Sequence, residues 1–225
     1  MKVILWDIDG TILNTGGAGV APLINAFKKY TRIEPVYDRN QYSGLTDHQI
    51  VNSLLSQNLI ESKIDLINTI ISEYETHLPE ALFGGKVVLL NDYHVILNDI
   101  ESSMNITNAI ATGNTLAGAT AKLESVNLLN EFKYLFCSDD LIPRSLIIKN
   151  AMNSFPTGTE FCVIGDTPHD IEAAHANNVP ILSVASGAYK SEDLLKFEPR
   201  VCLDKNWTLE ELRSSLGRIF SEKDY

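Results

Sequence analysis

The chain has 225 residues, of which 44% are hydrophobic and 21% are charged, and its formal net charge is −11. This composition is typical of a globular protein with one core and room for an insertion, and the acidic charge argues against a nucleic acid or an anionic membrane as a partner. No apolar run approaches the ~20 residues that span a bilayer, and the N-terminus does not resemble a signal peptide, so we expect a cytoplasmic protein.

The first predicted element is a buried strand over residues 2–6 (KVILW), a run of apolar and β-branched residues that is too short to favour a helix. Asp7 and Asp9 follow where this strand must end. Because alternate residues of a strand point the same way, the two carboxylates repel each other unless a cation, a proton or a hydrogen-bond donor holds them. Ordinary acids in a turn would give the same local pattern.

Amphipathic segments come next, with apolar residues three or four positions apart. They predict helices over residues 20–31, 46–59 and 62–78. Glycine pairs flank these helices, Gly16–Gly17 before them and Gly84–Gly85 after them. We therefore predict a helical insertion over residues 16–84, hinged at the glycines, with residues 1–15 and 85–225 forming the core.

Strands and helices alternate along the rest of the chain. The predicted strands lie within residues 108–114, 134–140, 160–170 and 179–187. The predicted helices lie within residues 115–127, 143–155, 171–178 and 191–197. This order predicts an α/β fold, a parallel sheet with helices on both faces, in which ligands bind at the carboxyl ends of the strands.

Acidic and small polar residues stand at several of these strand ends, and the topology places them on one rim of the sheet. They are Asp7, Asp9, Thr112, Gly113, Asn114, Asp166 and Asp170. Several carboxylates in one cleft require a hard cation, and oxygen ligands with open positions suit Mg²⁺. Alternatively, GDTPHD (165–170) could simply supply a helix cap and an acid in the first helical turn, both favourable at a helix N-terminus.

Three motifs in chain order, DIDGT, ATGN and GDTPHD, resemble the haloacid dehalogenase superfamily of aspartate-nucleophile hydrolases. The resemblance extends over nearly the whole chain. It implies a Rossmann-like core and, because the insertion follows the first motif, a mobile α-helical cap.

The same resemblance implies a role for each motif residue. Asp7 would attack phosphorus and form an aspartyl-phosphate, and Asp9 would act as general acid and then general base. Mg²⁺ would be held by Asp7, the backbone carbonyl of Asp9 and Asp166, with Asp170 on the metal or next to it. The phosphoryl oxygens would be bound by Thr112, Gly113 and Asn114.

A basic residue should offset the charge of the nucleophile and bind phosphate in such a protein. We favour Arg144, because it lies in the first turn of a predicted helix at the active rim. Lys149, more than a turn further on, and Lys122, if its helix leans across the cleft, are the alternatives. Each of these three could also be an ordinary solvent-exposed charge.

The predicted insertion contains SGLTDHQI (43–50), which resembles the substrate-specificity loop of this type of cap. Gly44 would permit a tight turn, and Thr46, Asp47 or His48 could face the leaving group. Thr46 or Asp47 could equally do no more than cap the following helix.

The main functional hypothesis is a Mg²⁺-dependent phosphatase that acts on a small phosphorylated metabolite. A phosphosugar mutase of the same superfamily would use the same residues and is the nearest alternative. A receiver-like signalling domain is a different class, against which the length, the insertion and Asp9 argue. A non-catalytic binding protein with this fold is a further possibility, and neither the substrate nor the oligomeric state can be deduced from the sequence.

Overall fold

The computed structural model describes residues 1–221, apart from the side chains of Arg39 and Asn40. Its centre is a six-stranded parallel sheet with the strand order β5-β4-β1-β6-β7-β8. In chain order these strands are β1 (Lys2–Trp6), β4 (Thr107–Ala111), β5 (Leu135–Phe136), β6 (Glu160–Gly165), β7 (Ile181–Val184) and β8 (Val201–Leu203). The predicted α/β architecture is confirmed.

Strand β1 lies between β4 and β6, and its register aligns the three strands at their carboxyl ends. Trp6 pairs with Ile110 of β4 and with Ile164 of β6. Residues 3–6 are fully buried, because helices cover both faces of a parallel sheet, and this explains the continuous apolar run. The residues that follow β1, β4 and β6 therefore emerge next to one another at one edge of the sheet.

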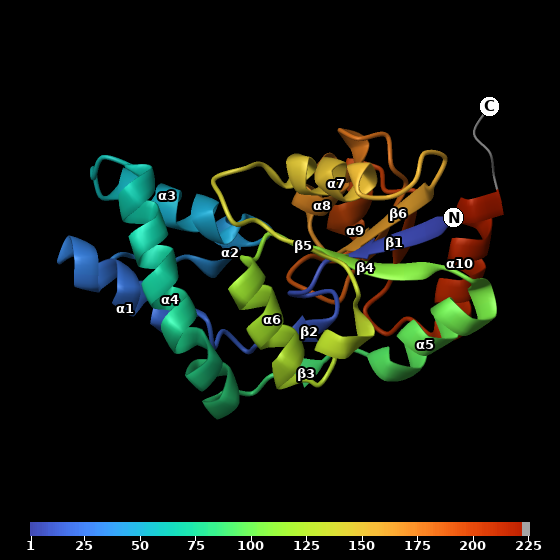
Figure 1. Cartoon of the computed structure of the whole chain (residues 1–225), viewed down its shortest axis with the longest axis horizontal. Coiled ribbons are helices and arrows are strands. Elements are labelled where there is room, and N and C mark those ends of the chain that lie inside the picture. Colours follow the sequence, from blue (N-terminus) through green and yellow to red (C-terminus); the bar gives the residue numbers. More distant parts are fainter. Residues whose placement is uncertain (222–225) are drawn as a thin grey trace.

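Helices cover the two faces of the sheet (Figure 1). One face packs against α5 (Tyr93–Met104), α6 (Leu116–Ser125) and α10 (Leu209–Ser221). The other face packs against α7 (Arg144–Asn153), α8 (Pro168–His175) and α9 (Ser191–Leu194). Two short 3₁₀ helices, η1 (Leu129–Glu131) and η2 (Leu195–Phe197), lie in the connections.

A separate group of helices lies at one end of the sheet (Figure 1). It consists of α1 (Val20–Thr31), α2 (Arg39–Tyr42), α3 (Asp47–Gln57) and α4 (Ile64–Gly84). These helices have an apolar core of their own, which includes the fully buried Phe27, Leu54 and Ile70. An antiparallel pair of strands, β2 (Leu13–Asn14) and β3 (Val88–Leu89), joins the chain entering this group to the chain leaving it. The exact limits of the insertion, and its mobility as a cap, stay predictions.

Helix α4 runs past the end predicted from the sequence. Its single proline, Pro79, lies inside the helix, which continues to Gly84 rather than ending at residue 78. A proline in a helix interior costs about 3 kcal/mol. Leu78 and Leu82, one turn apart on either side of Pro79, are both buried in the core of the helical group, and their burial offsets that cost.

Helices α5 and α10 and strand β8 are not among the elements predicted from the sequence. Leu212, Leu216 and Ile219 of α10 have helical spacing and are buried on the same face of the sheet as α5. Helix α10 is thus part of the core and closes the face that α5 and α6 leave open. Among residues 1–221, none of the helices is both long and apolar enough to cross a membrane.

The packing of α10 gives a stability prediction. Leu216 is fully buried, so Leu216→Ala should lower the free energy of unfolding by about 2–5 kcal/mol. Leu195 is 55% exposed, and Leu195→Ala should change it by less than about 0.5 kcal/mol. Urea unfolding followed by circular dichroism measures both values. An unchanged unfolding midpoint for Leu216→Ala would mean that α10 does not contribute to the core.

Candidate active site

Three buried carboxylates meet at the carboxyl edge of the sheet. Asp7 follows β1, Asp166 follows β6, and Asp170 lies in the first turn of α8. Each is 2% exposed, and one oxygen from each can be chosen such that all three lie within 4.8 Å of one another. The parallel register of β1 and β6 brings together acids that are more than 150 residues apart in the chain.

Burial of these acids disfavours their charged forms. It raises the pKa of Asp7, although the Arg144 guanidinium lowers it in part. Burial, and then repulsion from the Asp7 carboxylate, raise the pKa of Asp166 well above its ordinary value. A set of hard oxygen donors that resists ionisation unless positive charge is added fits a divalent cation such as Mg²⁺.

The hydrogen bonds of the three acids separate Asp170 from the other two. The Thr167 amide and hydroxyl both donate to Asp170, at 3.0 and 2.7 Å, and the Arg144 guanidinium bonds to its second oxygen. Thr167 caps α8, so Asp170 completes a capping box of the kind that the sequence left open as an alternative. Asp166 accepts one side-chain bond, from the Thr11 hydroxyl at 3.2 Å. Asp7 and Asp166 are therefore the better candidates for metal ligands, and Asp170 is placed to hold Arg144.

Two glycines make room for the Asp166 carboxylate. A Cβ atom at Gly10 or at Gly187 would overlap that carboxylate, and Gly10 also has a left-handed φ of +81°. Neither glycine is among the site residues predicted from the sequence. Gly10 belongs to the DIDGT motif, which could have pointed to it. Gly187 lies in VASGAY, where the sequence allows either a glycine that keeps the rim open or a plain turn.

Arg144 is the basic residue that lies among the three buried acids. Its side chain is 10% exposed, its Nη2 atom lies 3.3 Å from Asp7 Oδ1, and its Nη1 atom pairs with Asp170. Its Nε is buried and has no hydrogen-bond partner among the described residues. Lys149, the alternative more than one turn further along α7, is exposed.

Lys122 holds the other acid of the first motif. Its Nζ atom lies 2.6 Å from Asp9 Oδ2, which also accepts a bond from Asn114 Nδ2 at 2.8 Å. The Lys122 side chain is 8% exposed and that of Asp9 is 42% exposed. Burial alone would raise the pKa of Asp9, but the Lys122 charge and the bonds from Lys122 and Asn114 lower it below its ordinary value. Asp9 is therefore a carboxylate at neutral pH in this state.

The loop after β4 supplies polar groups next to these side chains. Asn114 Nδ2 also donates to the Thr112 hydroxyl at 2.8 Å, and Thr112 is fully buried. A Cβ at Gly113 would lie 3.1 Å from Arg144 Nη2, so the Gly113 backbone passes close to the guanidinium. Within the described part of the chain, the Gly113 amide donates no hydrogen bond. Thr115 then caps α6. The loop can thus offer donors to an anion beside Arg144.

The four residues predicted from the helical insertion separate into two pairs. Gly44 and Asp47 line the cleft. Thr46 caps α3 in a capping box with Gln49, as the alternative interpretation allowed, and His48 is buried at 3% exposure with Nδ1 unpartnered. Neither Thr46 nor His48 lines the cleft.

Asp47 connects the helical group to the loop after β4. Its amide donates to the Gly113 carbonyl at 3.0 Å, and its Oδ2 atom accepts from the Thr115 amide at 3.0 Å. Burial raises the pKa of Asp47, an effect that the nearby Lys122 charge partly offsets.

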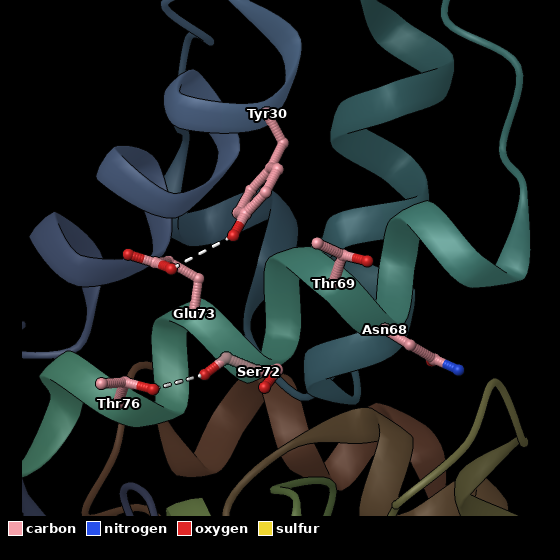
Figure 2. Close-up of a pocket in the computed structure, with 6 residues that line it drawn as sticks. All are labelled: Tyr30, Asn68, Thr69, Ser72, Glu73 and Thr76. Atoms are coloured by element: carbon pink, nitrogen blue, oxygen red, sulfur yellow. Dashed lines mark hydrogen bonds between the residues drawn. The ribbon is translucent and has the colours of Figure 1, made fainter.

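The cleft between the sheet edge and the helical group has a volume of about 470 Å³ and contains Asp7, Asp9, Lys122, Arg144 and Asp166. A second hollow of about 360 Å³ lies on the outside of the helical group, between α1 and α4 (Figure 2). It is lined by Tyr30, Asn68, Thr69, Ser72, Glu73 and Thr76. The two hollows share no lining residue, and the acid cluster belongs to the first.

Comparison with known proteins gives a consistent result. A family model described as haloacid dehalogenase-like hydrolase matches residues 4–184. A phosphoglycolate phosphatase from Colwellia psychrerythraea is 26% identical over 227 aligned positions, covering 96% of this chain and 97% of that protein.

Two solved structures agree in fold. A "predicted phosphatase" from Clostridium acetobutylicum matches with a TM-score of 0.76 at 18% identity, covering 96% of this chain and 98% of that one. A candidate β-phosphoglucomutase from Bacteroides vulgatus matches with a TM-score of 0.74 at 15% identity, covering 97% and 90% of the two chains.

The crowding of Asp166 predicts a loss of metal affinity without a loss of fold. Gly187→Ala would push the carboxylate away, so we expect the Mg²⁺ affinity to fall at least about tenfold, as in sites whose supporting residues are changed. Isothermal titration calorimetry measures the affinity. Gly217→Ala is the matched control, because a Cβ there meets nothing within 4 Å. Equal Mg²⁺ affinities for the two variants would argue against Asp166 as a ligand.

Proposed function

The chain belongs to the haloacid dehalogenase-like hydrolases, and we propose that it is a Mg²⁺-dependent phosphatase that hydrolyses a small phosphorylated metabolite through an aspartyl-phosphate. The observation that carries the proposal is the position of the buried Asp7, which lies between Asp166 and Arg144 with Asp9 two residues further along the chain. A carboxylate nucleophile, a metal site, a phosphate-binding cation and an acid–base group are thus available in one cleft. The curated phosphoglycolate phosphatase relative supports the same reaction class.

Asp7, Asp166 and the backbone carbonyl of Asp9 would hold Mg²⁺ in this proposal. The bound ion would neutralise charge between the nucleophile and the phosphoryl group, so that two anions can approach each other. Arg144 and the Gly113 amide would bind the phosphoryl oxygens from the other side.

In the first step an oxygen of the Asp7 carboxylate attacks phosphorus, and the bond from phosphorus to the leaving-group oxygen breaks. Asp9 donates its proton to that oxygen, so an alcohol leaves. The phosphate dianion of the substrate would raise the pKa of Asp9 and favour the protonated form that this step requires.

In the second step a water molecule attacks the phosphorus of the aspartyl-phosphate and passes a proton to the Asp9 carboxylate. The bond between phosphorus and Asp7 breaks, phosphate leaves and Asp7 is restored. Lys122 and Asn114 would keep Asp9 in place through both steps. The helical group would exclude bulk water while the cleft is closed.

A phosphosugar mutase is the second possible function, because the chain shares its fold with the solved structure described as a β-phosphoglucomutase candidate. It would use the same first step and return the phosphoryl group to a sugar. Receiver-like signalling or simple binding is a weaker proposal, because either would leave the Asp9, Lys122 and Asn114 arrangement without a role. A cytoplasmic location stays a prediction.

The proposed reaction is tested by phosphate release from a panel of phosphorylated metabolites. We expect release by the wild-type chain, loss of release with a chelator and recovery with added Mg²⁺. Asp7→Asn should lower kcat at least about 10³-fold, because a carboxamide is a poor nucleophile. Asp92→Asn, a change at an exposed acid that caps α5, serves as the matched control and should keep wild-type activity.

Two results would contradict this proposal in different ways. Wild-type rates for Asp7→Asn would exclude Asp7 as the nucleophile. Interconversion of hexose-phosphate isomers without phosphate release would identify a mutase.

The choice among the basic residues is tested separately. Arg144→Met should lower kcat/KM by about 10²–10³-fold, because it removes a buried donor from the site of developing charge. Lys149→Met removes an exposed charge from the same helix and should have an effect of less than twofold, within roughly RT ln 2. Steady-state kinetics on the best substrate of the panel compares the two. A larger loss for Lys149→Met would reverse the assignment.

A further inference from the structure

The two sides of the 470 Å³ cleft differ in chemistry. The side formed by the sheet edge carries the acid cluster and the two cations Lys122 and Arg144. The side formed by the helical group carries aliphatic side chains such as Val20 and Ile50, together with tyrosines, among them Tyr74. This second side faces the part of the substrate that leaves, because the phosphoryl group must lie against Asp7.

Both cations of the cleft are already paired with acids of the sheet edge. Lys122 pairs with Asp9, and Arg144 pairs with Asp7 and Asp170. No other Lys or Arg is found among the described side chains that line the cleft. Arg39, whose side chain is outside the described set, is not counted. The described wall around the leaving group therefore contains no positive charge.

The charge that this wall does contain is negative. Asp47 lines the cleft at the start of α3, and its carboxylate is fixed there by the bond from the Thr115 amide. Its charge is felt along this wall: after burial, the negative charges of Asp47 and Asp9 are the next causes that raise the pKa of Tyr74. Lys122 lies near enough to Asp47 to offset part of its charge, but its ammonium group is already bonded to Asp9 and Asn114. An anionic leaving group would therefore meet the Asp47 carboxylate without a free cation among the described side chains.

The same wall offers partners to an uncharged alcohol. The Tyr74 hydroxyl makes no hydrogen bond to a described residue and lies at the cleft surface, so it can bind a hydroxyl group of a substrate. Aliphatic and aromatic faces next to it suit the C–H faces of a sugar or polyol, which are apolar between polar hydroxyls.

We propose that the substrate is a phosphomonoester of an uncharged sugar or polyol, and that Asp47 is the specificity-determining residue that excludes phosphomonoesters with a carboxylate on the leaving group. This inference rests on the proposed phosphatase function and narrows it. It separates the chain from the activity named for its phosphoglycolate phosphatase relative, because glycolate carries such a carboxylate.

Matched substrate pairs test the proposal. In each pair a CH₂OH group replaces a carboxylate: 2-hydroxyethyl phosphate against 2-phosphoglycolate, glycerol 3-phosphate against 3-phosphoglycerate, and sorbitol 6-phosphate against 6-phosphogluconate. We expect kcat/KM to be at least about tenfold higher for the CH₂OH member of each pair that is cleaved, because like charges in a partly buried cleft repel strongly.

The role of Asp47 is tested by Asp47→Asn. Asparagine keeps an oxygen that can accept from the Thr115 amide, but it removes the charge. The ratio of kcat/KM values within a pair should fall at least about threefold in this variant. Asp65→Asn is the matched control, because Asp65 is also an acid in the first turn of a helix of the same group but is exposed, and its ratio should equal that of the wild-type chain.

The outcomes separate this inference from the proposed function. If p-nitrophenyl phosphate is cleaved and the carboxylate-bearing members are cleaved as well as or better than their partners, the phosphatase stands and the inference is wrong. If the pairs show the preference but Asp47→Asn leaves the ratio unchanged, the assignment to Asp47 is wrong. If neither p-nitrophenyl phosphate nor any member of the pairs is cleaved, the phosphatase proposal fails and the inference falls with it.

Discussion

The burial of three carboxylates at one edge of the sheet is the constraint on which the rest of the site depends. Asp7, Asp166 and Asp170 are each 2% exposed, and a buried charge without a partner costs several kcal/mol. Among the described side chains, the positive group that lies between these acids is the guanidinium of Arg144, which contacts Asp7 and Asp170. One cation for three acids leaves the cluster short of positive charge. A divalent ion held by Asp7 and Asp166 would supply the missing positive charge. The repulsion between the carboxylates, which disfavours the cluster on its own, is therefore the reason why it is a strong candidate site for Mg²⁺.

The acids of this cluster pack closely against the backbone of neighbouring glycines, which restricts the movement of their side chains. A Cβ at Gly10 or Gly187 would overlap the Asp166 carboxylate, and a Cβ at Gly165 would overlap Asp170. The acids thus occupy space that other residues would fill, and their side chains have little freedom to turn away. Such pre-organisation matters because a group that is displaced by about 1 Å loses much of its catalytic effect. A side chain larger than that of glycine at Gly10, Gly165 or Gly187 would therefore disturb both the packing and the position of the acids.

The sequence could predict the sheet and the acids because both depend on a local pattern and one topological rule. Short apolar runs that end in Asp7, Thr112 and Asp166 indicate strands, and parallel strands place their carboxyl ends at one edge. The sequence could not decide among the basic residues, because the decision depends on how α6 and α7 pack. Lys122 reaches Asp9 and Arg144 reaches Asp7, whereas Lys149 points to solvent.

Helix α10 could have been predicted from the sequence, because its buried leucines and isoleucine have helical spacing. Helix α4 continues through Pro79 beyond the predicted end at residue 78, because the burial of Leu78 and Leu82 offsets the usual effect of a proline.

The short loop after β4 makes one of the contacts between the helical group and the cleft. Asp47 exchanges two hydrogen bonds with this loop, one with the Gly113 carbonyl and one with the Thr115 amide. Between these residues the loop carries Asn114, which holds Asp9 at 2.8 Å. Movement of the helical group would therefore disturb the segment that positions Asp9, so closure of a cap would be coupled to the organisation of the proposed acid–base residue. A hydrogen bond between neutral groups contributes about 0.5–1.5 kcal/mol, and one to a charged group such as the Asp47 carboxylate contributes about 1.5–3 kcal/mol. A helical group that moves as predicted for a cap would break these two bonds on opening and form them again on closing, and their directionality would restore one closed geometry.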